Sequence, residues 1–279
     1  MRGLRPLPVL LLALLACGPG APAGAEPAVP ARSAGAAAAA AGGGPVVLEL
    51  FTSQGCSSCP AADRLLTRLG EDPELLTRVL PLAYHVDYWN HIGWTDPFSS
   101  KRWSERQRRY ARALGSDRLY TPQLVVDGRA DVVGSKEEEV YRLVRAALER
   151  PPAAAVHLQL SAGGPDALRA EVAARLERPP AAGSGKALEL LVALYQKDLT
   201  TAVPRGENSG RKLENDYVVR YLERAGKLAA KAGAELDAGV SFELEPDWRR
   251  ADLGVVAFVQ DPETLAIHGA ARATLEIIE

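Results

Sequence analysis

Apolar and polar positions change their spacing several times between residues 45 and 150. Branched apolar residues dominate residues 46–51, a run long enough for one buried strand. After a short turn, the spacing of Leu65, Leu66 and Leu69 predicts the apolar face of a helix. Residues 79–86 predict a second strand, and the basic segment 101–114 predicts a second helix. This part of the chain therefore starts as strand, helix, strand, helix.

A hairpin and a third helix are predicted next. Residues 124–126 form a short apolar run that Asp127 and Gly128 close as a turn, and residues 131–134 return as the partner strand. We expect Ser135 to cap a helix over residues 136–149, with Glu138 completing a capping box. The full order is β-α-β-α-β-β-α, which places this part in the α/β class.

The rest of the chain has shorter, partly alternating runs separated by Gly, Pro and Asp. This pattern is typical of an all-β, immunoglobulin-like sandwich. A helix over residues 218–232 is the alternative for one segment. A chain of 279 residues suits two domains, which we place at residues 45–150 and 153–279. The expected strands are residues 156–161, 168–174, 187–195, 216–221, 240–244, 254–259 and 270–277.

The N-terminus has the pattern of an export signal. Basic residues precede an apolar run that is too short to span a bilayer. Leu14-Leu15-Ala16-Cys17 resembles a bacterial lipobox, which predicts a signal peptide over residues 1–16 and lipid attachment at Cys17. Ordinary cleavage near residues 21–25 is the alternative. Residues 17–44 are rich in Ala, Gly and Pro and predict a flexible tether, so we expect an exported protein of the cell envelope, attached to the membrane by lipid.

Charge and cysteine content limit the classes of function that the chain can have. The net charge is −2, which gives no electrostatic reason to expect a nucleic-acid partner. Of the 3 cysteines, lipidation of Cys17 leaves Cys56 and Cys59, spaced as Cys-x-x-Cys. In an exported protein this pair is protected from cytosolic reductants.

The pair falls where a strand passes into a helix, so Cys56 lies near a helix N-terminus. Unpaired N–H groups and the helix dipole favour a thiolate there, and Cys59 is placed to resolve a mixed disulfide. A purely structural disulfide is the alternative. It would close a very small loop and so constrain the unfolded chain little. We also expect the turn to expose at least one sulfur, and the pKa of the nucleophile to be moderately lowered.

Thr121 and Pro122, directly before the hairpin strand, resemble the second half of the thioredoxin pattern. In that family the proline is cis and its loop packs against the dithiol, so we expect both residues to align an extended partner segment. Long segments of both predicted domains resemble a family of secreted bacterial thioredoxin-like proteins that is catalogued as a domain of unknown function. The resemblance implies a thioredoxin-like domain followed by a β-rich domain, and it implies no substrate. It rests on LELFTSQGCSSCPAAD, AYHVDYWNHIGWTDPFSS, ERQRRYA, YTPQLVVDG and RGENSGRKLENDYVVR.

Other polar residues near the dithiol have two interpretations. His85 and Asp87 share one strand face, and we expect them to hydrogen-bond each other and support the loop that carries Trp89 and Trp94. The alternative is a metal site in which these two side chains join the cysteines. His91 and Asp96 would complete that set. We expect no metal and no other cofactor.

Two polar segments complete the prediction. The basic side chains of residues 101–112 predict a solvated helix face. The glycine-rich loop 205–211 predicts a turn of the β domain that packs on the first domain.

Three functions therefore remain open. The first is an envelope thiol-disulfide oxidoreductase whose partner is a protein thiol or disulfide. The second is a metal-handling or assembly factor, and the third is a binding module with a structural disulfide.

Overall fold

The computed structural model describes residues 43–164, 166–180 and 185–275. The expected signal peptide, Cys17 and nearly all of the expected tether lie outside these residues. No helix in the described ranges is both long enough and apolar enough to cross a membrane. The elements, in chain order, are β1 (Val46–Thr52), α1 (Cys59–Glu71), β2 (Val79–His85), α2 (Lys101–Ala113), β3 (Gln123–Val126), β4 (Ala130–Val133), α3 (Glu137–Leu148), β5 (Ala154–Ala162), β6 (Ala167–Leu176), β7 (Leu188–Gln196), β8 (Leu199–Ala202), β9 (Lys212–Asn215), β10 (Val218–Leu228), β11 (Glu235–Glu243), a short 3-10 helix (Arg250–Asp252), β12 (Leu253–Gln260) and β13 (Ile267–Thr274).

One mixed sheet of 8 strands runs through both halves of the chain, in the order β13-β12-β7-β10-β2-β1-β3-β4. β1 and β2 are parallel, whereas β3 and β4 form the expected antiparallel hairpin beside β1. β10 joins the edge of β2 in a short parallel pairing between Val218 and Ala83. The strands of the C-terminal half therefore extend the sheet of the N-terminal half.

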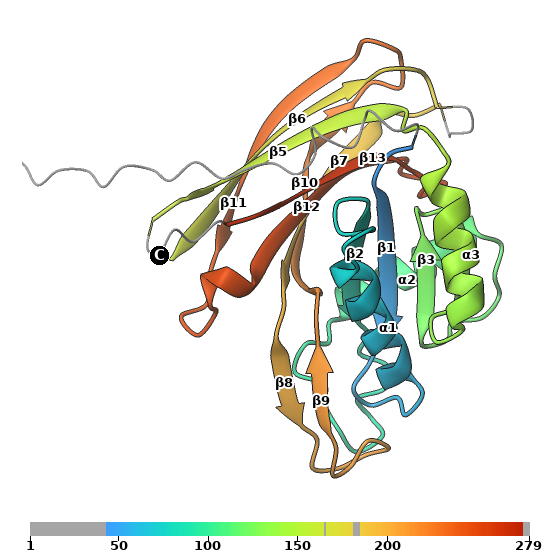
Figure 1. Ribbon diagram of the computed structural model, residues 1–279, viewed down its shortest axis with the longest axis vertical. Helices are drawn as coiled ribbons and strands as arrows, with labels where there is room; N and C mark the ends of the chain where they lie inside the picture. Colours follow the sequence, from blue (N-terminus) through green and yellow to red (C-terminus); the bar gives the residue numbers. More distant parts are fainter. Residues whose placement is uncertain (1–42, 165, 181–184, 276–279) are drawn as a thin grey trace, which may run out of the picture.

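Helices cover both faces of β1, which is why every residue of this strand is buried. Alternate side chains of β1, such as Leu48 and Leu50, pack in one core with leucines of α1 and valines of α3. The intervening side chains, such as Val47 and Phe51, pack in a second core with Trp103 and other residues of α2. Figure 1 shows α1 and α3 beside the strands of the N-terminal half, with α2 behind them.

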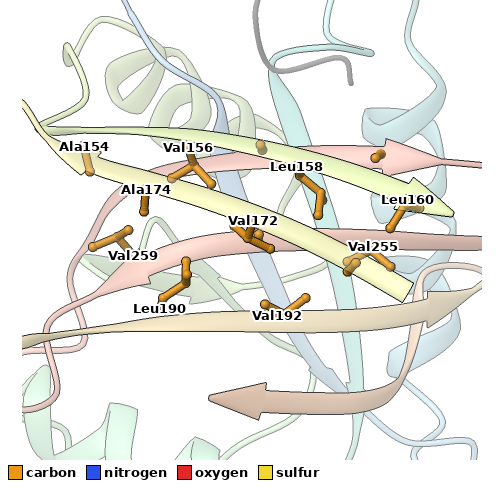
Figure 2. Close-up of a cluster of buried hydrophobic side chains, with 14 of the residues drawn as sticks. Ala154, Val156, Leu158, Leu160, Val172, Ala174, Leu190, Val192, Val255 and Val259 are labelled. Carbon is orange, nitrogen blue, oxygen red and sulfur yellow. The ribbon is translucent and has the colours of Figure 1, made fainter. Parts of the chain in front are cut away.

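A second sheet, of 3 strands in the order β11-β6-β5, lies over the C-terminal strands of the large sheet (Figure 1). Its inward positions alternate with exposed ones along β5 and β6, as expected for strands with one solvated face. Figure 2 shows the core between the two layers, where Leu158 and Val172 face Leu190 and Val255. This two-layer packing accounts for the sandwich-like sequence pattern.

The structure corrects several details of the sequence prediction. A strand occurs in each of the seven expected segments, but four of them belong to the sheet that continues into the N-terminal half, so no separate immunoglobulin-like sandwich is seen. Residues 218–228 form β10, which excludes a helix in this segment. Lys136, rather than Ser135, is the N-cap of α3, and it makes no side-chain capping bond. The coarse assignment to a mixed α/β fold holds.

The basic helix α2 is not a uniformly solvated face. Arg106 is buried and forms an ion pair with Glu49 of β1, with a nitrogen–oxygen distance of 2.7 Å. Tyr110 also donates to the Glu49 carboxylate, and Gln260 of β12 accepts from Arg106 at 3.2 Å. This buried polar group links an N-terminal strand, a helix and a C-terminal strand.

Candidate functional site

Cys56 and Cys59 lie at the junction of β1 and α1, as the sequence predicts. Cys59 is the first residue of α1, and Cys56 belongs to the turn before it, where the Cys59 N–H donates to the Cys56 carbonyl at 3.2 Å. The structure holds both as free thiols. The expectation of an exposed sulfur is wrong, because the exposed fractions of the two residues are 1% and 0%, while the intervening Ser57 and Ser58 are exposed.

The two thiols have different acidities. A hydrogen bond from the Cys59 side chain, helped by the Ser58 hydroxyl, lowers the pKa of Cys56 to about 6 against the opposing effect of burial. The Ser58 Oγ lies 3.2 Å from the Cys56 Sγ. Burial, together with the hydrogen bond to Cys56 and the nearby Asp63 charge, raises the pKa of Cys59. Near neutral pH, Cys56 is therefore the thiolate and Cys59 the thiol.

Thr121 and Pro122 lie directly beside this pair, although more than sixty residues separate them along the chain. The peptide bond between them is cis. The Thr121 carbonyl lies 3.9 Å from the Cys56 Sγ. The Thr121 hydroxyl accepts a hydrogen bond of 2.8 Å from the Trp89 indole N–H, which fixes the loop after β2 against the dithiol.

Three buried titratable side chains lie on the inner side of the dithiol. His85 Nδ1 is 2.7 Å from the Asp96 carboxylate, and both side chains are fully buried. Burial opposes charge on both groups, but their mutual attraction outweighs it, raising the pKa of His85 and lowering that of Asp96. Asp63, one turn after Cys59 on α1, accepts a 2.7 Å hydrogen bond from the Thr52 hydroxyl. Burial raises the pKa of Asp63 to about 7.

The partner of His85 is therefore Asp96, and the expected hydrogen bond between His85 and Asp87 is absent. Asp87 instead accepts a 2.5 Å hydrogen bond from the Ser104 hydroxyl of α2. The orientation differs because strand β2 ends at His85 and Asp87 lies beyond it. His91 lies on the exposed side of the same loop.

Gln54, just before the dithiol, connects the surrounding loops. It is buried, its N–H donates to Asp96 at 2.8 Å, and its side-chain amide donates to Asn215 of β9 at 2.9 Å. Its side-chain oxygen accepts from the Trp94 indole at 3.1 Å. Gln54 therefore connects the dithiol turn by hydrogen bonds to both the N-terminal and the C-terminal half of the chain.

A loop of the C-terminal half covers the dithiol turn, and we call residues 204–211 the covering loop. The buried Asn208 side chain donates to the carbonyls of Gln54 and Cys56, both at 2.9 Å, and the Glu207 carboxylate accepts from the Ser57 N–H at 2.9 Å. Gly206 has a φ of +79°, and a Cβ there would lie 3.1 Å from the Trp94 side chain. The expectation that this segment packs on the N-terminal half is confirmed.

The sequence prediction missed Asp63, Gln54 and Asn208. Asp63 follows Cys59 by four residues, so helical spacing could have placed it on the same face as the dithiol. The local sequence around Gln54 and Asn208 carries no comparable signal, because their partners are distant in the chain. Among the described residues, no group of three or more His, Cys, Asp or Glu side chains is arranged to hold a metal ion.

Comparison with known proteins identifies the family. The family model described as protein of unknown function (DUF1223) matches residues 47–260. The chain belongs to this family. The match includes the dithiol, Thr121, Pro122 and the covering loop, so the site lies wholly within the region that defines DUF1223. No curated protein matches the chain significantly in sequence.

Two solved structures have a similar arrangement. A structural-genomics target protein from Agrobacterium tumefaciens is 27% identical with a TM-score of 0.61, and the alignment covers 85% of this chain and 98% of that one. The HBP35 protein of Porphyromonas gingivalis is 20% identical with a TM-score of 0.57, covering 85% of this chain and 80% of that one. The second likeness is one of fold alone.

Proposed function

We propose that this DUF1223 protein is a thiol-disulfide oxidoreductase of the cell envelope, with a thioredoxin-like N-terminal half. The observation that carries the proposal is the division of acidity between two adjacent thiols. The pKa of Cys56 is lowered to about 6 and that of Cys59 is raised, directly beside the Thr121–Pro122 peptide bond. Thiol-disulfide exchange needs one cysteine that is a thiolate and attacks, and a second cysteine that remains a thiol until it resolves the mixed disulfide.

In the proposed reaction the Cys56 thiolate attacks one sulfur of a partner disulfide. The partner's other sulfur leaves as a thiolate, and a mixed disulfide joins Cys56 to the partner. Cys59 then loses its proton, and its thiolate attacks the Cys56 Sγ and expels the second partner thiolate. The partner gains two electrons and the Cys56–Cys59 disulfide forms; the reverse sequence oxidises a partner dithiol.

We assign to Asp63 the role of accepting the proton from the Cys59 thiol and of returning it in the reverse reaction. It lies one helical turn from Cys59 on the buried side of α1, and its pKa of about 7 lets it take up or release a proton near neutrality. Its charge is one cause of the raised pKa of Cys59, so ionised Asp63 is close enough to influence the resolving thiol. His85 and Asp96 form a buried pair next to this group, and their opposite charges compensate each other. We assign this pair no proton transfer.

Because both sulfurs are buried, a partner must displace part of the surrounding structure before it can reach Cys56. Ser57 and Ser58 are exposed above the dithiol, and Glu207 of the covering loop holds the Ser57 N–H. We assign Thr121 and Pro122 to the alignment of an extended partner segment beside Cys56. Location in the envelope and lipid attachment at Cys17 belong to the same proposal, because the N-terminal sequence supports both.

The reduction potential of the Cys56–Cys59 pair is the deciding measurement. Purified protein is equilibrated in glutathione and dithiothreitol buffers, and the oxidised fraction is measured by thiol alkylation. A potential between about −120 and −270 mV would place the pair among exchange catalysts. A potential below about −300 mV is typical of structural disulfides and would contradict the proposal.

A non-catalytic binding module is the second candidate, and the burial of both sulfurs favours it. The two candidates differ in what a resolving-thiol variant does. With Cys59→Ser, an oxidoreductase accumulates mixed disulfides through Cys56, and the double variant Cys56→Ser, Cys59→Ser accumulates none. A binding module gives no mixed disulfides in either variant. The metal-handling alternative gains no support from the described side chains.

A further inference from the structure

A pocket far along the sheet from the dithiol is lined by basic side chains of both halves of the molecule. Its volume is about 240 Å³. Arg129 lies in the turn between β3 and β4, Arg150 follows α3, and Arg178 follows β6. His268 of β13 completes the polar lining. The thiol chemistry proposed above uses none of these residues.

Within the described ranges, none of the three arginines forms an ion pair. Arg129 donates to the Ile267 carbonyl at 3.2 Å and Arg178 to the Pro151 carbonyl at 2.6 Å, which leaves further N–H groups on each guanidinium. Arg150 and Arg178 are exposed at the pocket, whereas Arg129 is half-buried. Of the charged neighbours of Arg129, Asp127 has the larger effect and attracts its guanidinium, whereas Arg150 repels it. A bound anion would relieve this repulsion.

His268 adds a buried donor. Its exposed fraction is 4%, and its Nδ1 lies 3.4 Å from the Arg129 guanidinium. Because a guanidinium can only donate, Nδ1 is the acceptor, and the proton of the neutral ring belongs on Nε2. Burial and the nearby Arg129 lower the pKa of His268 to about 4, so the ring is neutral at pH 7. Nε2 is buried and has no hydrogen-bond partner among the described residues.

One carboxyl group also lines the pocket. Asp127 accepts a 3.3 Å hydrogen bond from the Val47 N–H, and burial raises its pKa to about 6. It offsets one of the three guanidinium charges, so the pocket remains net positive. Guanidinium groups match the planar oxygens of carboxylate and phosphate groups better than any other side chain.

We propose that this pocket binds a small oxyanion, the phosphate or carboxylate group of a small molecule. Arg129 and the His268 Nε2–H would bind from inside the pocket, and Arg150 and Arg178 from its mouth. The volume is below the roughly 300–1,000 Å³ of pockets for drug-sized ligands, so it suits a single anionic group. Such a ligand would touch both halves of the chain.

The test is titration of the purified protein with inorganic phosphate and, separately, with succinate, at constant ionic strength by calorimetry. We expect saturable binding of at least one probe, and the stronger of the two identifies the preferred anion. Arg150→Gln removes a side chain with no hydrogen-bond partner in the described structure, so folding should be unaffected. Loss of one charged donor should weaken binding about tenfold or more.

Two further variants complete the test. His268→Phe keeps the ring volume and removes the Nε2–H, so binding should weaken while the protein remains folded. Arg108→Gln removes an exposed arginine of α2 outside the pocket and should leave binding unchanged. Absence of saturable binding for both probes would overturn the proposal, as would equal affinities for Arg150→Gln and Arg108→Gln. In either case Arg129 and Arg178 serve only to satisfy backbone carbonyls.

Discussion

At the scale of single residues, the environment makes two neighbouring cysteines chemically unequal. Cys56 receives hydrogen bonds from Cys59 and Ser58, whereas Cys59 lies deeper and near a carboxylate. The polar groups that produce this difference come from the dithiol turn, α1 and the Thr121 segment. Acidity is therefore set within a few ångströms of the sulfurs.

Ser58→Ala should raise the pKa of Cys56, because the variant loses a hydroxyl 3.2 Å from its sulfur. The rate of Cys56 alkylation by iodoacetamide, measured against pH in a Cys59→Ser background and in its Ser58→Ala derivative, reports the thiolate fraction. We expect the midpoint to move upward by up to about one pH unit, since one charged hydrogen bond contributes roughly 1.5 kcal/mol. Ser57→Ala is the matched control. Equal midpoints for both serine variants would exclude the hydrogen bond as a cause.

Asp63→Asn should stabilise the protein at alkaline pH. Burial raises the folded-state pKa of Asp63 from 3.8 to about 7, so the folded protein retains a proton that the unfolded chain loses. Protonated Asp63 therefore makes its full contribution to the free energy of unfolding below about pH 4. This contribution decreases between about pH 4 and pH 7 and is lost at higher pH. At pH 8 the variant should be more stable by up to about 4 kcal/mol, and at pH 4 nearly equal to the wild type.

Urea unfolding at the two pH values measures this difference. Asp117→Asn, at an exposed position, serves as control and should change stability little at either pH. A variant that is less stable than the wild type at pH 8 would mean that Asp63 is ionised and well paired in the folded protein.

At the scale of elements, the covering loop is the part of the C-terminal half that hydrogen-bonds the backbone of the dithiol turn. Asn208 satisfies two carbonyls of that turn, and Gly206 permits close contact with Trp94. The loop connects β8 and β9, which form a sheet of their own and pair with no other strand in the described part of the chain. A two-stranded hairpin is marginally stable by itself, so these contacts matter to its position.

Asn208→Ala should make the dithiol more accessible. The substitution leaves the carbonyls of Gln54 and Cys56 without their donor, at a cost of about 1–3 kcal/mol to the closed arrangement. Alkylation of Cys56 at pH 8 should accelerate by about fivefold or more if loop opening limits the rate. Ser209→Ala, in the same loop, removes only a bond to the Pro204 carbonyl and should have a smaller effect. An unchanged rate in Asn208→Ala would show that the loop does not control access.

Sequence patterns identify elements better than they identify partners. The positions of most strands, the dithiol at a helix N-terminus and the Thr121–Pro122 segment follow from contiguous residues with recognisable chemistry, whereas the short strands β8 and β9 are not predicted. The burial of Arg106 and the role of Asn208 depend on residues distant in the chain. The pairing of His85 with Asp96 depends on the path of the irregular loop between them. Periodicity does not specify which strand lies beside which, so the continuous sheet could not be read from the sequence.

At the scale of the whole molecule, a buried polar group joins the two halves. The Glu49–Arg106 ion pair and its bonds to Tyr110 and Gln260 are enclosed between β1, α2 and β12. Such a group is satisfied only when both halves are folded against each other. The halves should therefore unfold together.

Arg106→Met should destabilise the protein by about 3–5 kcal/mol, because it leaves the Glu49 carboxylate buried without its cation. The double variant Glu49→Met, Arg106→Met should recover much of this loss, since no buried charge remains. Thermal unfolding of both variants, followed by circular dichroism, makes the comparison. If the single variant lost less than 1 kcal/mol (about the value of an exposed pair), the buried ion pair would not be a structural link.

The pairing of β10 with β2 limits how the two halves of the chain can be separated, in evolution or in protein engineering. Modular proteins exchange parts at linkers, where a cut removes few contacts. Here a cut after residue 150 would bare the edge of β2, and unpaired strand edges recruit other chains. We therefore expect that the N-terminal half cannot be grafted alone onto another protein, and that the two halves are inherited, lost and transplanted together.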